Sequence, residues 1–280
     1  MCPFYEIIYM LTIDILICTI DEGILDVPKV LLPTCEGVNY IVSMQCSDES
    51  FRSLIPDILM RDDVKLSIIE GRGLSANRNN AIANSSADIC VIADDDVRYD
   101  LDTLNVLRGL YLSRPDADVI ILKASDVNGM PLKNYPKDTF SFPQVPKGYY
   151  PTSFEITFRR KSVQGICFDT RFGLGSECTA YGEEEVWVNS LVRKGVKVVY
   201  VPLTFVETTE CPKSALGLAL SKKKQFTKGA VLYYIYGWTS VLRCLKCAFL
   251  LSDNIATAFS SFVQMMKGIC YVIKTGGRNV

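Results

Sequence analysis

The sequence contains no histidine among its 280 residues. Histidine is the most common general base in enzymes and a frequent metal ligand, so both uses of an imidazole ring are excluded. Acid–base chemistry must then fall to carboxylates, lysine, tyrosine or cysteine. The motifs GxxxxGK[ST] and GxSxG are also missing, which excludes a P-loop and argues against a serine hydrolase.

Long apolar runs are missing as well. The longest uncharged run in the C-terminal tail, residues 229–242, has 14 residues, fewer than the ~18 needed to span a bilayer. The N-terminal residues are apolar but carry Glu6 and Asp14, with no basic region and no cleavage pattern. No signal peptide is therefore predicted.

A paired cysteine framework is missing too. The eleven cysteines are an odd number, and several lie in apolar runs such as 16–18 and 89–91, as expected of reduced thiols buried in a cytosolic protein. Cys244 and Cys247 have CxxC spacing but no second pair, which favours two residues on one helix face over a zinc or redox site. We therefore expect a cytoplasmic protein.

Acidic residues are nearly missing from the last quarter of the chain. Residues 1–211 carry 20 Lys and Arg against 30 Asp and Glu, whereas residues 212–280 carry 10 against one, Asp253. The net charges are −10 and +9, which sum to −1. This asymmetry predicts a catalytic domain at 1–211 and a basic, amphipathic helical extension at 212–280.

Short β-branched runs alternate with helical patterns along the first 200 residues. Strands are predicted at 13–19, 40–45, 64–69, 89–93, 119–123, 154–158 and 196–201, and helices at 75–84, 102–114 and 183–194. Residues 124–152 contain five prolines and are expected to form a long loop that shapes a cleft. The alternation predicts an α/β fold with a mainly parallel sheet and helices on both faces.

Three consecutive carboxylates, Asp94, Asp95 and Asp96, directly follow the predicted strand at 89–93. Ligands of such sheets bind beyond the carboxyl ends of the strands. Like charges in a row repel each other unless a cation or solvent screens them, and Mg²⁺ or Mn²⁺ held jointly with substrate phosphates suits this chemistry. An acidic turn that caps a helix is the structural alternative.

The turn Gly71-x-Gly73-x-x-Ala76 follows a predicted strand and opens a helix, as in dinucleotide-binding proteins. An NAD(P)-dependent oxidoreductase is therefore an alternative, although two strands precede this turn and no Tyr-xxx-Lys pair is present. Arg78, in the same helix, could bind a pyrophosphate through both guanidinium nitrogens, or lie on a solvated helix face.

A second acidic cluster, Glu183 to Glu185, follows Gly182 and opens a helix. Acidic residues are common in a first helical turn because they complement the helix dipole. One carboxylate beside the glycine-rich segment 173–175 could also act as a general base toward a hydroxyl group.

Taken in order, these motifs resemble the family 2 glycosyltransferases of the GT-A fold, especially bacterial members that build surface polysaccharides. The matching segments are Cys18-Thr19-Ile20-Asp21, Gly73-Leu74-Ser75-Ala76-Asn77-Arg78-Asn79, the triplet Asp94–Asp96, Phe172-Gly173-Leu174-Gly175, and Gly182-Glu183-Glu184. The resemblance covers residues 11–206. Two departures are Ile20, where the family often has an aromatic residue, and a Glu-Glu pair in place of Glu-Asp.

The resemblance implies a role for each matching residue. The triplet corresponds to the DxD motif, with Asp96 and Asp94 as metal ligands and with Asp94 and Asp95 facing the nucleotide. The nucleotide pocket would also be lined by Thr19, Asp21, Glu70 and Arg78. Glu184 would be the catalytic base, with Glu183 and Glu185 as alternatives, and Mg²⁺ or Mn²⁺ would be the cofactor.

The activity implied is that of an inverting glycosyltransferase. It would move a sugar from a UDP-sugar to a hydroxyl of a lipid-linked or polysaccharide acceptor, and no nucleic acid partner is expected. A catalytically inactive relative that only binds a sugar nucleotide is a further alternative.

The basic tail is expected to attach the protein to an anionic membrane surface. Lysines 222–224 and Lys228 precede the apolar, aromatic stretch 230–242, which contains Tyr233, Tyr234, Tyr236 and Trp238. Aromatic rings beside lysines suit the interface of the inner face of the cytoplasmic membrane. Packing on the catalytic domain or a contact within a homodimer is the alternative.

Overall fold

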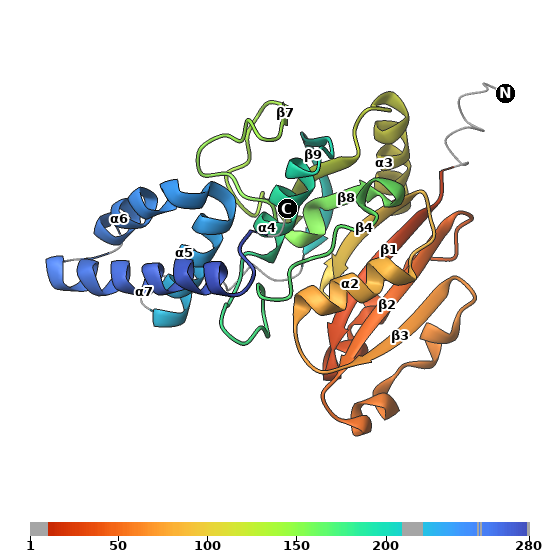
Figure 1. Ribbon diagram of the computed structural model, residues 1–280. Coiled ribbons are helices and arrows are strands. Elements are labelled where there is room, and N and C mark those ends of the chain that lie inside the picture. The colour runs from red at the N-terminus through yellow and green to blue at the C-terminus, as the bar shows by residue number, and fades with distance from the viewer. Residues whose placement is uncertain (1–10, 209–220, 251, 253, 279–280) are drawn as a thin grey trace. The chain divides into compact units, whose positions relative to one another are not determined.

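The computed structural model describes residues 11–208, 221–250, 252 and 254–278 (Figure 1). The chain divides into two compact units. In the described residues, the first unit comprises residues up to Arg72, Ala76–Cys167 and residues from Gly195 to Thr208, and the second comprises Gly73–Ser75, Phe168–Lys194 and the residues from 221 onward. The predicted boundary between residues 211 and 212 lies outside the described residues, as do residues 1–10.

The described strands are β1 Ile13–Ile20, β2 Val38–Cys46, β3 Val64–Glu70, β4 Ile89–Asp94, β5 Val97–Arg98, β6 Val119–Asp126, β7 Phe140–Ser141, β8 Ile156–Arg159 and β9 Val198–Thr208. The α-helices are α2 Leu74–Asn84, α3 Leu101–Ser113, α4 Glu183–Arg193, α5 Lys222–Tyr236, α6 Ser240–Leu250 and α7 Ile255–Lys274. Short 3₁₀ helices are η1 Asp21–Leu25, η2 Val27–Lys29, η3 Glu49–Leu54, η4 Asp57–Met60, η5 Ser153–Glu155, η6 Arg160–Val163 and η7 Gly237–Thr239.

One sheet forms the centre of the first unit. Its strand order is β3-β2-β1-β4-β8-β6-β9-β5, and β7 pairs with β9. The pairs β1–β2, β2–β3, β1–β4 and β6–β9 are parallel, whereas β8 is antiparallel to both of its neighbours, β4 and β6. The α/β fold predicted from the alternating pattern is confirmed, and the antiparallel insertion of β8 is an addition that the pattern did not indicate.

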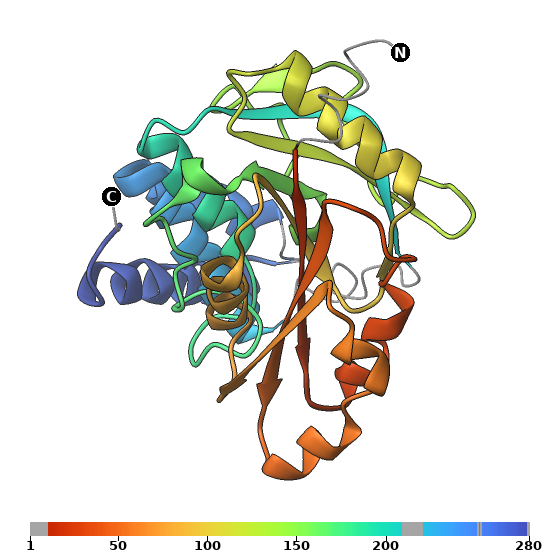
Figure 2. The same cartoon turned by 90° about the vertical axis from the view of Figure 1, so that its right-hand side faces the viewer.

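Both faces of the sheet are covered, as predicted. The first face carries the main apolar core, in which Ile13, Ile15 and Ile17 of β1 pack with residues of η1, η2 and α3. The opposite face of β1–β3 is covered by α2, and Figure 2 shows α2 and the 3₁₀ helices η1–η4 on opposite sides of these strands. Strands buried on both faces read as continuous apolar runs, which explains the sequence pattern of β1 and β4.

Residues 153–155 differ from the sequence expectation. They form the 3₁₀ turn η5 and not the start of a strand, because the Thr152 side chain and Glu155 cap each other across this turn. Strand β8 therefore begins only at Ile156. The long loop predicted at 124–152 is present, with the end of β6 at Asp126 and the two-residue strand β7 inside it.

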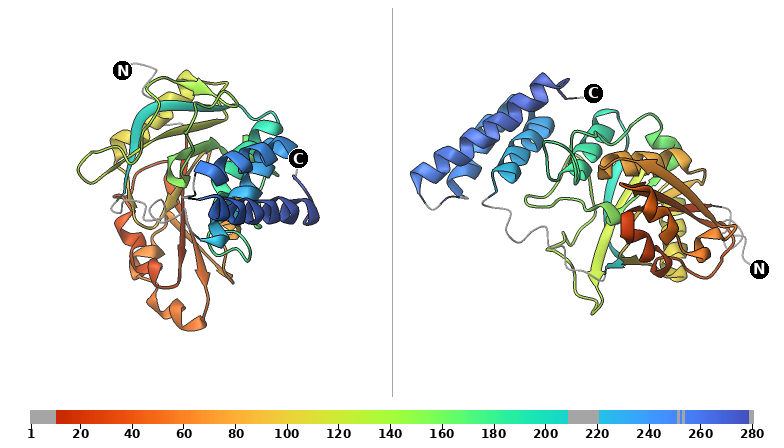
Figure 3. Two further views of the ribbon diagram at one scale, coloured as in Figure 1. Left: turned by 90° about the vertical axis from the view of Figure 1, so that its left-hand side faces the viewer. Right: turned by 90° about the horizontal axis from the view of Figure 1, so that it is seen from below.

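The second unit is helical and has its own apolar core, built by Phe172, Val186 of α4, and residues of α5, α6 and α7. Helix α7 runs beside α5 and α6 (Figure 3). Because Phe172 and Val186 share this core, Phe168–Lys194 groups with the C-terminal helices and not with the sheet. None of the helices in the described part of the chain combines the length and the hydropathy of a transmembrane span.

Packing in the second unit corrects one detail of the membrane expectation. The stretch 230–242 begins inside α5, where Ala230, Val231, Tyr233 and Tyr234 are buried in the helical core. The Tyr234 hydroxyl lies 3.0 Å from Ser190 Oγ of α4. The α5 part of this stretch is therefore a packing face, and Trp238 is the strongly exposed aromatic residue of the set.

Candidate nucleotide-sugar site

The carboxyl ends of β1, β2, β3 and β4 meet at one edge of the sheet because these four strands are parallel. This register places Thr19, Asp21, Glu70 and the triplet Asp94–Asp96 at the same edge. All of these predicted site residues therefore belong to the first unit. Ligands of parallel sheets bind at such an edge, so the edge is the candidate site.

Asp95 is held against the end of β1. The Thr19 hydroxyl donates a hydrogen bond of 2.5 Å to Asp95 Oδ2. The backbone of Gly23 approaches the same oxygen so closely that a Cβ atom at this position would lie 2.5 Å from it. A larger residue at position 23 would therefore force the Asp95 and Thr19 side chains to shift.

The Asp95 carboxyl is also electrostatically unusual. Burial, followed by repulsion from Asp94 and Asp96, raises its pKa from 3.8 to about 6, against the lowering effect of the Thr19 hydrogen bond. Ionisation of a buried carboxyl is costly in isolation, and a nearby cation makes it more favourable. Burial also raises the pKa of the neighbouring Cys18 thiol to about 12, which keeps this cysteine protonated.

Both carboxylate oxygens of Asp94 are positioned by neighbours. Arg78 Nη2 lies 3.5 Å from Oδ1, and the Ser153 hydroxyl donates a 3.1 Å hydrogen bond to Oδ2. The Arg78 side chain is only 2% exposed, so its guanidinium faces Asp94 from inside the protein. Arg78 is therefore part of the support of the acidic triplet.

A polar network fixes α2, and hence Arg78, on the sheet. Asn77 Nδ2 donates to the Thr19 carbonyl at 2.9 Å, and the Ser43 hydroxyl donates to Asn77 Oδ1 at 2.5 Å. Asn80 Nδ2 then donates to the hydroxyls of Ser43 and Ser67 at 2.7 and 2.9 Å. Buried polar groups need such partners, and here the partners link the Thr19 end of β1 to α2.

Asp21 has an unusual backbone for a non-glycine residue, with φ at 51°. Its carboxylate accepts hydrogen bonds from the Ser47 backbone N–H and hydroxyl, both at 2.8 Å, and Arg72 Nη2 lies 3.8 Å away. Strained residues of this kind concentrate at functional sites. Glu70 ends β3 at the same edge and is exposed.

The acidic edge has the donor chemistry that Mg²⁺ or Mn²⁺ requires. Among the described residues, no three His, Cys, Asp or Glu side chains converge on one point. Mg²⁺ is usually held by one or two carboxylates together with substrate phosphates and water, so a two-carboxylate set fits it. Asp94 and Asp96, both partly exposed at the end of β4, are the residues that would hold such an ion.

The second acidic cluster lies in the second unit, at the first turn of α4. Gly182 precedes it with φ at 93°, and a Cβ atom there would lie 2.4 Å from Val231 Cγ2. Glu183 is buried against the backbone of Gly173, whereas Glu184 and Glu185 are partly exposed. Glu184 and Glu185 are therefore accessible from solvent, whereas Glu183 is not.

Four residues of this site were given no role by sequence reasoning. Ser153 lies 59 positions from Asp94, Gly23 is a single glycine in an acidic turn, and Asn77 and Ser43 come from different elements. Gly23 stands four residues after Thr19 and could have been noticed as a glycine beside a strand end. Nothing in the sequence indicates the Ser153 contact.

The glycine turn at 71–73 does not occupy the position that dinucleotide binding requires. It follows β3, which ends the described strand order, whereas the dinucleotide turn follows the first, central strand of its domain. The turn instead leads into α2 and so places Arg78 below Asp94. The oxidoreductase alternative thus has no support from the topology.

Comparison with known proteins agrees with this arrangement. The sequence profile described as Glycosyl transferase family 2 matches residues 29–176, a segment that contains Arg78 and Asp94–Asp96 and ends before Glu183. No curated protein sequence is significantly similar to the chain.

Solved structures of S. aureus TarS have a similar fold. TarS 1-349 is 14% identical with a TM-score of 0.55, over 95% of this chain and 92% of that chain. Its complex with UDP-GlcNAc is 13% identical with a TM-score of 0.53, over 95% and 93%, and its complex with UDP is 13% identical with a TM-score of 0.53, over 91% and 81%. The likeness spans nearly the whole chain and shows that the fold is GT-A.

The profile match covers more than half of the chain, and the parallel strands carry the acidic triplet at their carboxyl edge as the motif order implied. The protein belongs to glycosyltransferase family 2.

Proposed function

We propose that the protein transfers a sugar from a UDP-sugar to a hydroxyl group of a lipid-linked or polysaccharide acceptor, with inversion at the anomeric carbon. The observation that carries this proposal is the acidic triplet at the carboxyl edge of the sheet. There Thr19 holds Asp95, and Arg78 and Ser153 hold Asp94. Preorganised carboxylates at this edge are suited to bind the diphosphate of a sugar nucleotide through a cation.

Support for a uridine nucleotide comes from the TarS structures, whose complexes contain UDP-GlcNAc and UDP. We propose that Thr19, Asp21, Glu70, Arg78, Asp94 and Asp95 line the corresponding pocket of this chain. Thr19, which donates to Asp95, and Asp21, which accepts from Ser47, both lie at the carboxyl end of β1. Their closeness in the chain suits one continuous pocket.

We further propose that Asp96 and Asp94 hold Mg²⁺ or Mn²⁺. When bound, the ion would offset the negative charge that grows on the diphosphate leaving group. The protein's own part is to position Asp94 through Arg78 and Ser153 and to hold Asp95 through Thr19.

We propose Glu184 as the base that takes the proton from the acceptor hydroxyl as its oxygen attacks the anomeric carbon. Two observations support it over its neighbours. Glu184 is partly exposed whereas Glu183 is buried, and Glu184 aligns with the acidic pair of the family motif. Glu185 remains the runner-up.

We propose that the acceptor is an intermediate in the synthesis of a bacterial cell-surface glycan. It rests on the motif order, which is most similar to bacterial family members, and on a basic C-terminal segment that suits a lipid-linked acceptor. The reaction would then take place at the cytoplasmic side of a membrane.

The proposal is tested by incubating the full chain with a panel of UDP-, GDP- and dTDP-sugars and Mn²⁺. The expected result is slow release of UDP from a UDP-sugar, with NMR showing that the first sugar product has the opposite anomeric configuration to the donor. Binding of UDP-sugars without turnover in the presence of glycan acceptors would favour the inactive relative. A specific spectral response to NAD(P)H without any response to UDP-sugars would favour the oxidoreductase.

A further inference from the structure

Large apolar side chains gather on the outer surface of the second unit. Among the described residues, nine large apolar side chains are at least 60% exposed, and six of them lie within residues 238–259. We call these six the α6–α7 surface; they are Trp238, Leu242, Phe249, Leu250, Ile255 and Phe259. Concentrated exposure of this kind marks an interaction site, whereas scattered apolar residues do not.

In helix α6 the small residues are buried and the large apolar residues are exposed, the opposite of an ordinary surface helix. Its buried face carries the small residues Ser240, Cys244 and Ala248, and its exposed face carries Leu242 and Phe249. A surface helix normally turns its large apolar residues toward the core. The large apolar side chains of α6 are therefore accessible to a binding partner.

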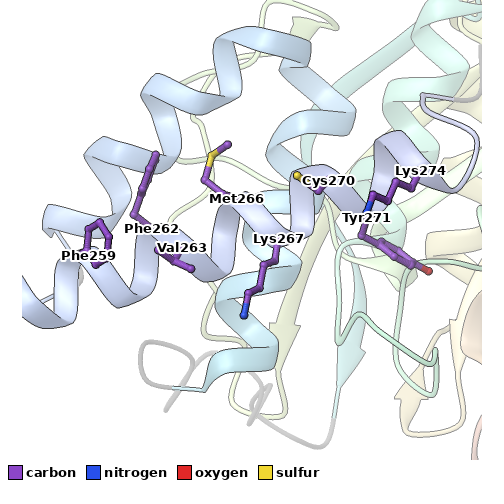
Figure 4. Close-up of a pocket in the computed structure, with 8 residues that line it drawn as sticks. All are labelled: Phe259, Phe262, Val263, Met266, Lys267, Cys270, Tyr271 and Lys274. Carbon is purple, nitrogen blue, oxygen red and sulfur yellow. The ribbon is translucent and has the colours of Figure 1, made fainter.

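Helix α7 continues this surface. Ile255 is 80% exposed and Phe259 is 69% exposed in its first two turns. Further along, an open groove of about 480 Å³ follows the helix, and Figure 4 shows Phe259, Val263 and Lys267 projecting from the same side of α7. Apolar side chains with a lysine beside them thus extend over several turns.

The charge around these residues has one sign. The described residues from 221 to 278 contain nine Lys and Arg and no Asp or Glu. Arg243 and Lys246 flank the exposed apolar face of α6, and Lys267 and Lys274 are exposed on α7. The Arg243 guanidinium also lies 3.8 Å from the centroid of the Tyr236 ring, next to Trp238 in sequence.

We propose that the α6–α7 surface binds the surface of an anionic lipid bilayer, with its apolar side chains at the boundary of headgroups and acyl chains. Such helices lie about 5–10 Å deep in the interface, and each cation adds attraction to anionic lipid. A second copy of the chain fits less well, because a symmetric contact would bring Arg243 and Lys246 near the same cations of the partner without a carboxylate in the described part of this segment.

The two tryptophans of the chain allow a direct test. Trp187 is fully buried and stacks on Phe168 at a centroid distance of 4.3 Å, whereas Trp238 is 72% exposed. Vesicles of phosphatidylcholine mixed equally with phosphatidylglycerol should shift the emission of the full chain to shorter wavelength, and brominated lipid should quench it. The variant Trp238→Phe should lose both responses, since Trp187 stays in the core. Responses that persist in Trp238→Phe would overturn the proposal.

Flotation with the same vesicles measures the two parts of the surface. Arg243→Gln with Lys246→Gln should lower the affinity by about 30-fold, from roughly 1 kcal/mol for each cation. Phe249→Ser with Leu250→Ser should lower it by about tenfold or more. Matched controls are Lys137→Gln with Lys161→Gln and Met60→Ser with Met130→Ser, which change exposed residues of the first unit and should bind as the parent does.

Several outcomes would contradict the proposal. Absence of flotation with anionic vesicles, equal binding to pure phosphatidylcholine, or equal losses in the control variants would each overturn it. Self-association in sedimentation experiments without lipid, lost in Phe249→Ser with Leu250→Ser, would assign the surface to a second copy instead. Thermal unfolding of each variant shows whether it is folded, and an unfolded variant is replaced by the corresponding single substitution.

Discussion

At the scale of single residues, burial in the fold makes the Asp95 carboxyl harder to ionise than an ordinary aspartic acid. Its carboxyl has a pKa of about 6 against the usual 3.8, so between these values the folded protein keeps a proton that the unfolded chain has lost. Stability contributed by this residue therefore falls as pH rises from about 4 to 6, and the full penalty is present above pH 6.

The variant Asp95→Asn tests this sign. Asparagine keeps an oxygen that can accept from Thr19 but has no charge, so the variant should gain stability over the parent by about 2 kcal/mol between pH 4 and pH 7. Urea unfolding at both pH values measures the difference, in which the other titrating groups cancel. A difference that is the same at pH 4 and pH 7 would show that Asp95 has an ordinary pKa.

Asp96 tests the proposed cation. Asp96→Asn should weaken Mn²⁺-dependent binding of UDP by roughly tenfold or more, since a metal ligand becomes neutral. The fold should persist because this side chain lies in the turn after β4 and is partly exposed. Calorimetric titration with UDP, with and without Mn²⁺, measures the effect, and Asp62→Asn on the exposed surface is the control. Full metal dependence in Asp96→Asn, or unchanged activity in excess EDTA, would remove the metal from the mechanism.

Glu184 tests the proposed base. Glu184→Gln should lower turnover by about 10² or more, while donor affinity stays the same, because proton transfer matters only in the transition state. Rates and donor dissociation constants are compared with those of Glu183→Gln and Glu185→Gln. If Glu184→Gln remains active and one of the other two loses turnover, the base is that neighbour.

At the scale of elements, the pairing of α5 with α7 depends on two glycines. A Cβ atom at Gly229 would lie 1.9 Å from the Met265 carbonyl oxygen, and one at Gly268 would lie 2.0 Å from the Phe226 carbonyl oxygen. The helix backbones are therefore in direct contact, and no side chain can be added without moving a helix.

Gly268→Ala should consequently destabilise the protein by about 1–3 kcal/mol or more, the usual cost of overpacking. Gly109→Ala in α3 is the matched control, because nothing lies within 4 Å of its Cβ position and an alanine favours the helix by up to about 1 kcal/mol. Thermal unfolding should move in opposite directions for the two variants. A gain in stability for Gly268→Ala would contradict the close helix contact.

The turn η5 is supported by a buried ion pair. Lys133 Nζ donates to Glu155 Oε2 and to Thr152 Oγ1, both at 2.8 Å, and the Tyr135 hydroxyl donates to Glu155 Oε1 at 2.6 Å. Burial raises the pKa of Glu155, and Lys133 opposes this. Because Ser153 of the same turn donates to Asp94, the ion pair also supports the acidic edge.

Lys133→Met should therefore cost about 3–5 kcal/mol near neutral pH, since the Glu155 carboxylate is left buried without its cation. The pKa of Glu155 should rise further, so the loss should be smaller at pH 5 than at pH 8. Urea unfolding of Lys133→Met and of Lys133→Met with Glu155→Gln measures this, and the double variant should lose the pH dependence. Equal stability of Lys133→Met and the parent would show that the pair contributes nothing.

At the scale of the whole molecule, the fold is shared with TarS at 14% identity. The apolar strand pattern and the alternation with helices specify such a fold, and many sequences satisfy both. The similarity to TarS therefore supports the fold alone. The role of each residue is argued from its own contacts and is tested by substitution.

The charge division of the chain also belongs to this scale. The tail from residue 212 carries a net +9, against −10 before it, and the described part of the tail shares an apolar core with Phe172 and Val186. The cations that this leaves exposed stand beside apolar side chains, which is why the second unit, and not the sheet, carries the proposed lipid contact.

The fold class and most of its elements could be predicted from the sequence alone. Continuous apolar runs and helical patterns located β1–β4, α2, α3 and α4 to within two residues, because a strand buried on both faces leaves a local signal. The acidic triplet was likewise readable, since its residues are consecutive and follow a strand.

The residues that support the triplet, and the exposed side of each tail helix, depend on packing between distant parts of the chain. Ser153 meets Asp94 across 59 residues, and Arg78 turns inward because α2 is fixed by Ser43 and Asn77. The sequence predicts the stretch 230–242 at a membrane surface, yet residues 230–234 of α5 are core, and the most exposed apolar residues of the tail lie in η7, α6 and the start of α7. Contacts between distant segments and the orientation of a helix depend on how the other elements pack. Local sequence patterns do not indicate this packing.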